Sequence, residues 1–258
     1  MATVLFEKKN GIGYVTIHRP EVMNSFNYST LLALEEIVEA LTVDNEVRVV
    51  IFTGAGDKAF SAGADLKERR TLSEQEVRRN VKKIGDVFQR IDELPQPTIA
   101  AINGYAFGGG FELALACDFR IAARHAQIGL TETSMAIIPG AGGTQRLPRL
   151  IGTARALELI LTAKKLTAEE ALAYGILTRV VDGSELMAAC EAFAAAMLKN
   201  GPIALQQAKF AIKQGMDTDL KTGLKIESKA YEVTIPTKDR VEALQAFSEK
   251  RPPRFTGE

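Results

Sequence analysis

The chain has 258 residues, of which 46% are apolar and 25% are charged, a balance typical of an ordinary globular protein and not of a disordered chain or a fibre. Lys plus Arg and Asp plus Glu both number 32, so the formal net charge is zero, which argues against a strongly basic nucleic-acid binder. The start, MATVLFEKKNGIGYV, lacks the basic and apolar regions of a signal peptide, and no run of about 18 uncharged apolar residues follows. We therefore expect an intracellular, cytoplasmic protein without a membrane segment.

The first hundred residues alternate between strand and helix signals. Two short strands at 3–6 and 14–18 flank a glycine turn and predict a hairpin. Apolar residues at helical spacing predict a helix at 29–41, with Ser29 or Thr30 as its cap. The continuous apolar run at 48–52 favours a strand in a sheet that is covered on both faces. A loop is expected at 53–65, and a helix at 73–94 ends at two prolines, with Val77, Val81, Ile84, Phe88 and Ile91 as its inner stripe.

The pattern continues to residue 181 and then changes. Strands are expected at 98–102, 119–123, 126–129 and 177–181, and helices at 154–161 and 166–174, with a glycine-rich loop at 139–143. After 181 only helices are expected, at 185–199, 203–214, 220–233 and 237–250. The prediction is thus an α/β fold of repeated units, in which strands are followed by a helix. Its α/β core would span 1–200, and a helical C-terminal region would span 201–258.

The most informative stretch is 103–118, NGYAFGGGFELALACD, which reads as a tight glycine turn entering a buried helix. A dinucleotide fingerprint would need a glycine at Leu113, and a phosphate loop would need a lysine after its last glycine. Both types of site are therefore excluded. What remains is a bare backbone amide, best placed at Gly109, at a helix start that favours negative charge. A turn that serves only close packing is the alternative.

A second glycine turn, AGADLK at 62–67, also enters a helix after a strand. If Ala64 faces Gly109, two amides from separate loops would converge on one oxygen and form an oxyanion hole. Each such donor typically contributes about 2.7–4 kcal/mol of transition-state stabilisation. The sequence alone leaves this pairing open.

Two glutamates are candidates for acid–base chemistry. Glu112 stands among apolar residues (FELALA), where a charge is costly unless it is paired or used. Glu132 lies between a predicted strand and the loop at 139–143. Two carboxylates in one dry pocket would repel, and their pKa values would separate into one acid and one base. For either glutamate taken alone, a solvated or salt-bridged residue is the favoured interpretation.

The remaining titratable candidates form no ligand cluster. Cys117 and Cys190 stand among alanines at helical positions, so we expect buried free thiols. His18 and His125 are far apart in the sequence and are interpreted as structural or surface residues. No metal site is predicted.

Three motifs together resemble the crotonase, or enoyl-CoA hydratase/isomerase, superfamily over nearly the whole chain. They are AFSAGADLKE, AAINGYAFGGGFELALACD and IGLTETSMAIIPGAGGTQRLPRLIG. The resemblance implies a spiral core of ββα units, with Ala64 and Gly109 as oxyanion donors. It implies Glu112 as the base that activates water and Glu132 as the acid that protonates the α-carbon. No cofactor is implied, because coenzyme A is part of the substrate.

The resemblance also implies where the thioester binds. Possession of both glutamates favours a hydratase over an isomerase. Lys67 or Arg69 would be available to a CoA phosphate, whereas Glu21 stands where relatives commonly have a lysine. The acyl pocket would include Met135 and Ile138. The full set of implied substrate contacts is Val22, Ala62, Ala64, Asp65, Leu66, Lys67, Gly109, Pro139 and Gly140.

The region from 215 to the C-terminus is similar to methylglutaconyl-CoA hydratases. We therefore weigh a short-chain enoyl-CoA hydratase of β-oxidation or related acyl-CoA catabolism against a 3-methylglutaconyl-CoA hydratase. Those relatives are also described as binding AU-rich RNA through a lysine stripe on an early helix. The matching helix here carries Glu35, Glu36 and Glu39 and no lysine, which disfavours RNA binding.

The terminal helices have more apolar residues than a short appendage can bury by itself. They are Leu220, Leu224, Ile226, Tyr231, Val233 and Ile235. We expect them to mediate oligomerisation, and the resemblance implies a homotrimer or a dimer of trimers.

Overall fold

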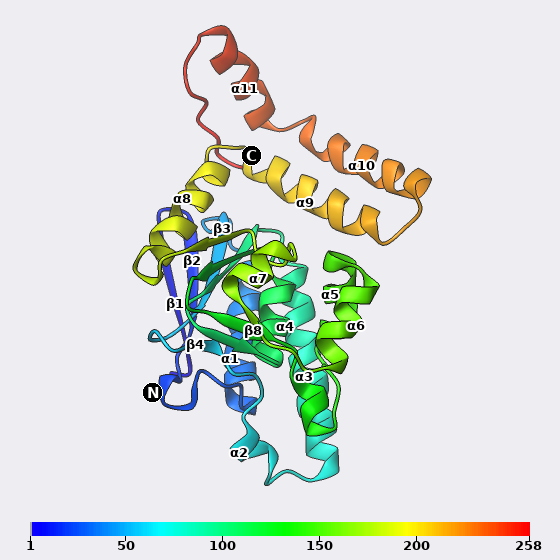
Figure 1. The fold of residues 1–258 in the computed structure, drawn as a ribbon. Coiled ribbons are helices and arrows are strands. Elements are labelled where there is room, and N and C mark those ends of the chain that lie inside the picture. Colours follow the sequence, from blue (N-terminus) through cyan, green and yellow to red (C-terminus); the bar gives the residue numbers. More distant parts are fainter. Residues whose placement is uncertain (1) are drawn as a thin grey trace.

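The computed structural model describes residues 2–258 and shows an α/β fold, as predicted (Figure 1). A six-stranded sheet has the order β1-β2-β3-β5-β7-β10, and a four-stranded sheet has the order β4-β6-β8-β9. Within residues 2–258 neighbouring strands are parallel, except for the antiparallel β1/β2 hairpin and the β8/β9 pair. The strands are β1 (Val4–Lys9), β2 (Ile12–Ile17), β3 (Val49–Gly54), β4 (Ala59–Ser61), β5 (Thr98–Ile102), β6 (Tyr105–Phe107), β7 (Phe119–Ala123), β8 (Gln127–Gly129), β9 (Leu166–Thr167) and β10 (Arg179–Val181).

Three successive strand pairs form the centre of the large sheet and most of the small one. In β3/β4, β5/β6 and β7/β8, the first strand joins the large sheet and the second joins the small one, and a helix follows each pair. This arrangement is the repeated strand-strand-helix unit of the predicted spiral core. The helices before the C-terminal region are α1 (Tyr28–Thr42), α2 (Leu66–Arg69), α3 (Glu74–Asp92), α4 (Gly109–Ala116), α5 (Gly143–Ile151), α6 (Thr153–Leu161), α7 (Ala168–Ala173) and α8 (Leu186–Leu198), with 3-10 turns η1 (Pro20–Val22), η2 (Glu132–Met135) and η3 (Gly183–Glu185).

The central strands β3 and β5 of the large sheet are buried on both faces, as their continuous apolar runs predict, whereas the edge strands β1 and β10 are partly exposed. Successive side chains of a strand point to opposite faces, so β3 and β5 contribute to two apolar clusters. One face packs with α1, α3 and α4, and the other packs against α8. The first cluster takes Val50, Phe52, Ala100 and Ile102 from these strands, and the second takes Val49, Ile51, Ile99 and Ala101.

Two local predictions were wrong. The cap of α1 is Asn27, whose Oδ1 accepts the Thr30 N–H at 3.0 Å, and not Ser29 or Thr30. Asn is as good an N-cap as Ser, and the helix begins at Tyr28, one residue earlier than predicted. The predicted helix at 166–174 is split, because Thr167 ends β9 and then caps α7 through a capping box.

Three strands and one α-helix were not predicted. Strands β4, β6 and β9 have only two or three residues each, too few for a periodic signal. Helix α5 begins at a glycine and contains Pro148, and both residue types indicate a loop when the sequence is considered alone. These short elements matter because β4, β6 and α5 surround the candidate site.

Between 202 and 248 the C-terminal region consists of three helices joined by short turns and contains no strand, as predicted. Helices α9 (Pro202–Met216) and α10 (Leu220–Thr234) run side by side, and α11 (Lys238–Ser248) follows (Figure 1). In Figure 1 they lie above the two-sheet core and not around it. The domain division at residue 200 and the assembly role of 201–258 stay predictions.

Both cysteines, Cys117 and Cys190, are free and buried, which confirms the prediction. Among the helices described in residues 2–258, none combines the length and the apolarity needed to span a membrane.

Candidate active site

The glycine triplet forms the turn between β6 and α4. Gly108 has φ +52°, a left-handed conformation that disfavours other residues. A Cβ at Gly110 would stand 2.0 Å from the Ser61 carbonyl oxygen, so any side chain there would separate α4 from β4. The triplet therefore allows a close approach between the helix start and the loop after β4.

That approach brings the two predicted amide loops together. A Cβ at Gly63 would lie 2.9 Å from the Gly109 nitrogen, and a Cβ at Gly109 would lie 3.8 Å from the Ala64 nitrogen. Gly109 is the first residue of α4, so its N–H has no acceptor within the helix. Within residues 2–258, the Ala64 N–H donates no hydrogen bond either. Both amides are thus available to one acceptor in the cavity that they border.

That cavity has a volume of about 540 Å³, and both glutamates contribute to its wall. The size suits a small-molecule site, for which volumes of about 300–1,000 Å³ are usual. Its lining is mainly apolar, with the two carboxylates and one arginine. It consists of Ala62, Gly63, Ala64, Leu66, Arg69, Val81, Ile84, Gly108, Gly109, Glu112, Thr131, Glu132, Met135, Ile137, Ile138, Gly140 and Ala141.

Glu112 is held rigidly on α4. Its side chain is buried, and its Oε1 accepts the N–H groups of Ala141 at 2.8 Å and Gly143 at 2.9 Å. Burial raises the pKa of this carboxyl, while the two N–H donors and the nearby Arg146 guanidinium oppose the rise. Two amide donors favour the ionised form, and they orient the carboxylate.

Glu132 has a different environment on η2. It is also buried, but its Oε2 has no hydrogen-bond partner among residues 2–258. Burial, followed by the charge of Glu112, raises the pKa of Glu132 to about 7. Glu112 has two amide donors and Glu132 has none at Oε2, so Glu132 is the carboxyl that more readily keeps a proton. One acid and one base can therefore face the same cavity.

The structure brings most of the predicted site residues to this cavity. Ala62, Ala64, Leu66, Gly109 and Gly140 line it together with both glutamates, as do Met135 and Ile138.

The other predicted substrate contacts lie outside the cavity wall. The Asp65 carboxylate accepts from the N–H groups of Lys67 and Glu68 and forms an ion pair with Arg19 at 2.9 Å. Lys67 is exposed, and Val22 is half-buried in η1. Pro139, the first residue of the glycine-rich loop, is buried. Their contacts with CoA stay predictions.

Sequence reasoning missed two groups that shape the site. Val81 and Ile84 were predicted to belong to the inner stripe of α3, but they line the cavity, and the buried residues of α3 are Val87, Phe88 and Ile91. The Ala141 and Gly143 amides that hold Glu112 were also missed. The glycines of PGAGG were the available signal, because a side chain at Gly143 would lie 3.0 Å from Glu112 Oε1.

Comparison with known proteins identifies the family. Residues 7–258 match the model of the enoyl-CoA hydratase/isomerase family. A Bacillus subtilis protein, YngF, which is provisionally named an enoyl-CoA hydratase/isomerase, is 53% identical over 256 residues, covering 99% of this chain and 98% of that protein. Human mitochondrial methylglutaconyl-CoA hydratase is 49% identical, covering 98% of this chain and 76% of that protein. The crystal structure of an enoyl-CoA hydratase from Bacillus anthracis superposes with a TM-score of 0.98 at 50% identity, with full coverage of both chains. The chain therefore belongs to the enoyl-CoA hydratase/isomerase family, that is, to the crotonase superfamily.

Proposed function

We propose that this enzyme is a lyase that adds water across the 2,3 double bond of short-chain trans-2-enoyl-CoA thioesters to give 3-hydroxyacyl-CoA. The observation that carries the proposal is one cavity bordered by two available amides and two glutamates in unlike environments. The reaction would serve β-oxidation or related acyl-CoA breakdown in the cytoplasm.

In the proposed mechanism, the thioester carbonyl oxygen lies between the N–H groups of Ala64 and Gly109. Negative charge that develops on this oxygen as the β-carbon is attacked is stabilised there, and the double bond becomes electrophilic. Glu112 removes a proton from water while the water oxygen bonds to the β-carbon. Glu132 gives its proton to the α-carbon on the same face, so the addition is syn.

The roles of the two glutamates follow from what holds each one. The amides of Ala141 and Gly143 stabilise the ionised Glu112, which suits a base. Glu132, with a pKa of about 7, is protonated in a large fraction of molecules near neutral pH, which suits an acid. After each turnover, Glu112 holds the extra proton and Glu132 lacks one, and exchange with solvent restores the starting state.

A hydration assay with crotonyl-CoA and longer 2-enoyl-CoA thioesters tests the proposal directly. We expect crotonyl-CoA to be hydrated with a kcat in the ordinary range of about 1–10³ s⁻¹. An enzyme that shifts the double bond of 3-enoyl-CoA but does not hydrate 2-enoyl-CoA would be an isomerase, and the proposal would be wrong.

A 3-methylglutaconyl-CoA hydratase is the second candidate, and Arg69 favours it. Arg69 is the one cation among the cavity-lining residues, and it makes no ion pair within residues 2–258. A substrate with a second carboxylate would be repelled by Glu112 and Glu132 unless a cation were nearby. The similarity to the human methylglutaconyl-CoA hydratase agrees with this choice.

Substituting Arg69 by Met is therefore expected to raise KM for 3-methylglutaconyl-CoA about tenfold, because the distal carboxylate loses its partner. KM for crotonyl-CoA, which has no distal carboxylate, should change by less than about twofold. Steady-state kinetics with both substrates measures the difference, and the exposed Arg70 provides a matched control as Arg70→Met. If KM for both substrates rose equally, Arg69 would contact the CoA part that they share.

We also propose that the chain assembles as a homotrimer or a dimer of trimers through its C-terminal helices. Five of the six apolar side chains named for this role are exposed in the single chain, namely Leu220, Leu224, Tyr231, Val233 and Ile235, and Ile226 is half-buried. Phe247 on α11 is 87% exposed, which is costly for an aromatic side chain unless another surface covers it.

Sedimentation velocity at micromolar concentration is expected to show a trimer or a hexamer. Tyr231→Glu should shift the protein toward smaller species, because the substitution places a charge in the proposed interface. Glu36→Gln, an exposed change on α1, serves as the control. A wild-type protein that sediments as a monomer contradicts the proposal.

A further inference from the structure

The loop that holds Glu112 is itself held from behind by Arg146 of α5. Arg146 Nη1 donates to the Ala141 carbonyl oxygen at 3.0 Å, and the N–H of the same residue, Ala141, donates to Glu112. Gly142 has φ +105°, and a Cβ there would stand 2.1 Å from Arg146 Nη1. The guanidinium thus occupies the space that a side chain at residue 142 would need.

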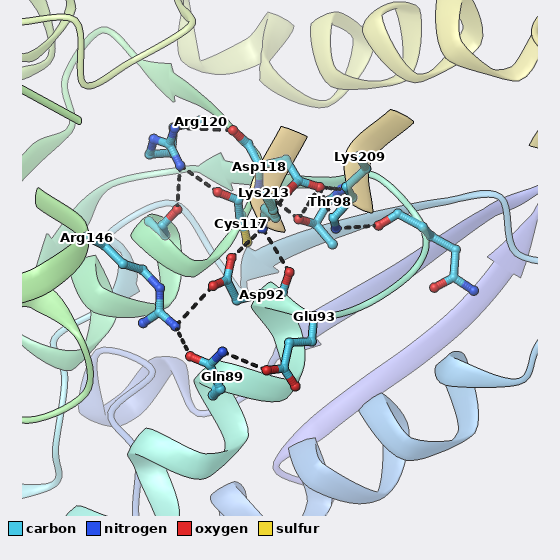
Figure 2. Close-up of polar contacts among 12 residues, drawn as sticks. Gln89, Asp92, Glu93, Thr98, Cys117, Asp118, Arg120, Arg146, Lys209 and Lys213 are labelled. Carbon is cyan, nitrogen blue, oxygen red and sulfur yellow. Dashed lines mark hydrogen bonds and ion pairs between the residues drawn. The ribbon is translucent and has the colours of Figure 1, made fainter. Parts of the chain in front are cut away.

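Arg146 is fixed in turn by the end of α3, and α9 holds that end through Lys213 (Figure 2). Its Nη2 donates to Gln89 Oε1 at 2.8 Å and lies 3.4 Å from Asp92 Oδ2. Asp92 is also paired with Lys213 of α9, whose Nζ donates to the Asp92 carbonyl oxygen at 2.8 Å. Lys213 lies 2.9 Å from Asp118 Oδ1 as well.

This network is largely shielded from solvent. The side chains of Arg146 and Asp92 are only 17% and 26% exposed. A partly buried guanidinium that contacts a carbonyl, an amide oxygen and a carboxylate at the same time has little freedom to move. The order of contacts runs from Lys213 through Asp92 and Arg146 to Ala141, and ends on the carboxylate of Glu112.

We propose that Arg146 is a positioning residue for the hydration reaction, which fixes the Ala141 amide and thereby aims Glu112, and that Asp92 and Lys213 hold it in place. The inference rests on the proposed function, because the orientation of the Glu112 carboxylate affects the rate only if Glu112 activates the attacking water. Arg146 is not among the cavity-lining residues, so it acts through the loop and not on the substrate. A displacement of a reacting group by about 1 Å can cost about 10²-fold in rate.

The test compares two reactions that use different parts of the site. Hydration of crotonyl-CoA needs Glu112, Glu132 and the two amides. Exchange of an α-hydrogen of butyryl-CoA with solvent deuterium adds no water, so it needs only Glu132 and the amides. A misdirected Glu112 should therefore impair the first reaction and leave the second.

For Arg146→Met we expect kcat for crotonyl-CoA hydration to fall about 10- to 100-fold, with KM changed less than about threefold. Exchange measured by NMR on butyryl-CoA should stay within about twofold of wild type. Arg149→Met is the matched control: Arg149 lies on the same helix with its side chain 64% exposed, and both reactions should be unchanged. Glu132→Gln provides the reference in which exchange is lost.

Two results would overturn the inference: hydration by Arg146→Met within twofold of wild type, or hydration and exchange reduced in parallel. If Arg146→Met does not fold, Arg146→Lys answers the same question. A lysine keeps the charge beside Asp92 but cannot contact Gln89 and Ala141 as a planar fork. Its hydration rate should also fall while exchange is retained. A wild-type protein that hydrates no enoyl-CoA would instead refute the proposed function, so the two failures are distinguishable.

Discussion

Replacing Glu112 with glutamine is expected to lower kcat for crotonyl-CoA hydration by about 10²- to 10⁴-fold, the usual contribution of a positioned general base. The amide oxygen of glutamine can still accept from Ala141 and Gly143, so the loop should keep its conformation. What is lost is the ability to take a proton from water. KM should change little, because neither oxyanion amide is altered.

The control for this substitution is Glu36→Gln, which removes one negative charge from an exposed position on α1. Its kcat should equal that of the wild type. Thermal melting of Glu112→Gln should match the control closely or exceed it, since a neutral side chain costs less to bury than a charged one. Near-wild-type hydration by Glu112→Gln would show that another group activates the water.

The elements with long, regular signals could be predicted from the sequence, and the short ones could not. Strand β5 at 98–102 has five consecutive apolar or small residues and was predicted with its observed bounds. Helix α3 begins at a capping box formed by Ser73 and Glu76, which a local motif reveals. By contrast, β4 and β6 exist because they pair with each other, and no local signal of pairing is present in three residues.

The site shows the same division. The sequence alone shows a glycine triplet and two glutamates, Glu112 and Glu132, in unusual surroundings. The resemblance to the crotonase superfamily suggests their roles. Helical spacing marks Ile84 as apolar and inward-facing, but it does not say whether the side chain meets the core or a cavity. The function of Arg146 depends on where α3 ends relative to α5, which is a tertiary relation that no spacing encodes.

Replacing Glu132 with glutamine is the second change with a large expected effect. Hydration and α-hydrogen exchange should both fall by about 10²- to 10⁴-fold, because the group that carries the α-proton is removed. In the wild type, kcat/KM should fall as pH rises through about 7, since the acid must be protonated and its pKa in the free enzyme is raised to about 7. A pH profile of kcat/KM between pH 5 and 9 measures this decrease.

The same raised pKa predicts that Glu132→Gln, which lowers activity, raises the stability of the folded protein at high pH. The carboxyl has an ordinary value of 4.5 and a folded value of about 7, so the folded state holds the proton more tightly than the unfolded chain does. As pH rises from about 4.5 through 7, the wild type therefore loses folding free energy that the neutral glutamine does not lose. At pH 8 we expect the variant to melt a few degrees higher, at about 2–4 °C per kcal/mol for a chain of this size, and at pH 4 we expect the difference to vanish. Equal melting temperatures at pH 8 would mean that the ionised Glu132 is not destabilised in the fold, and the burial beside Glu112 would then not explain its role as the acid.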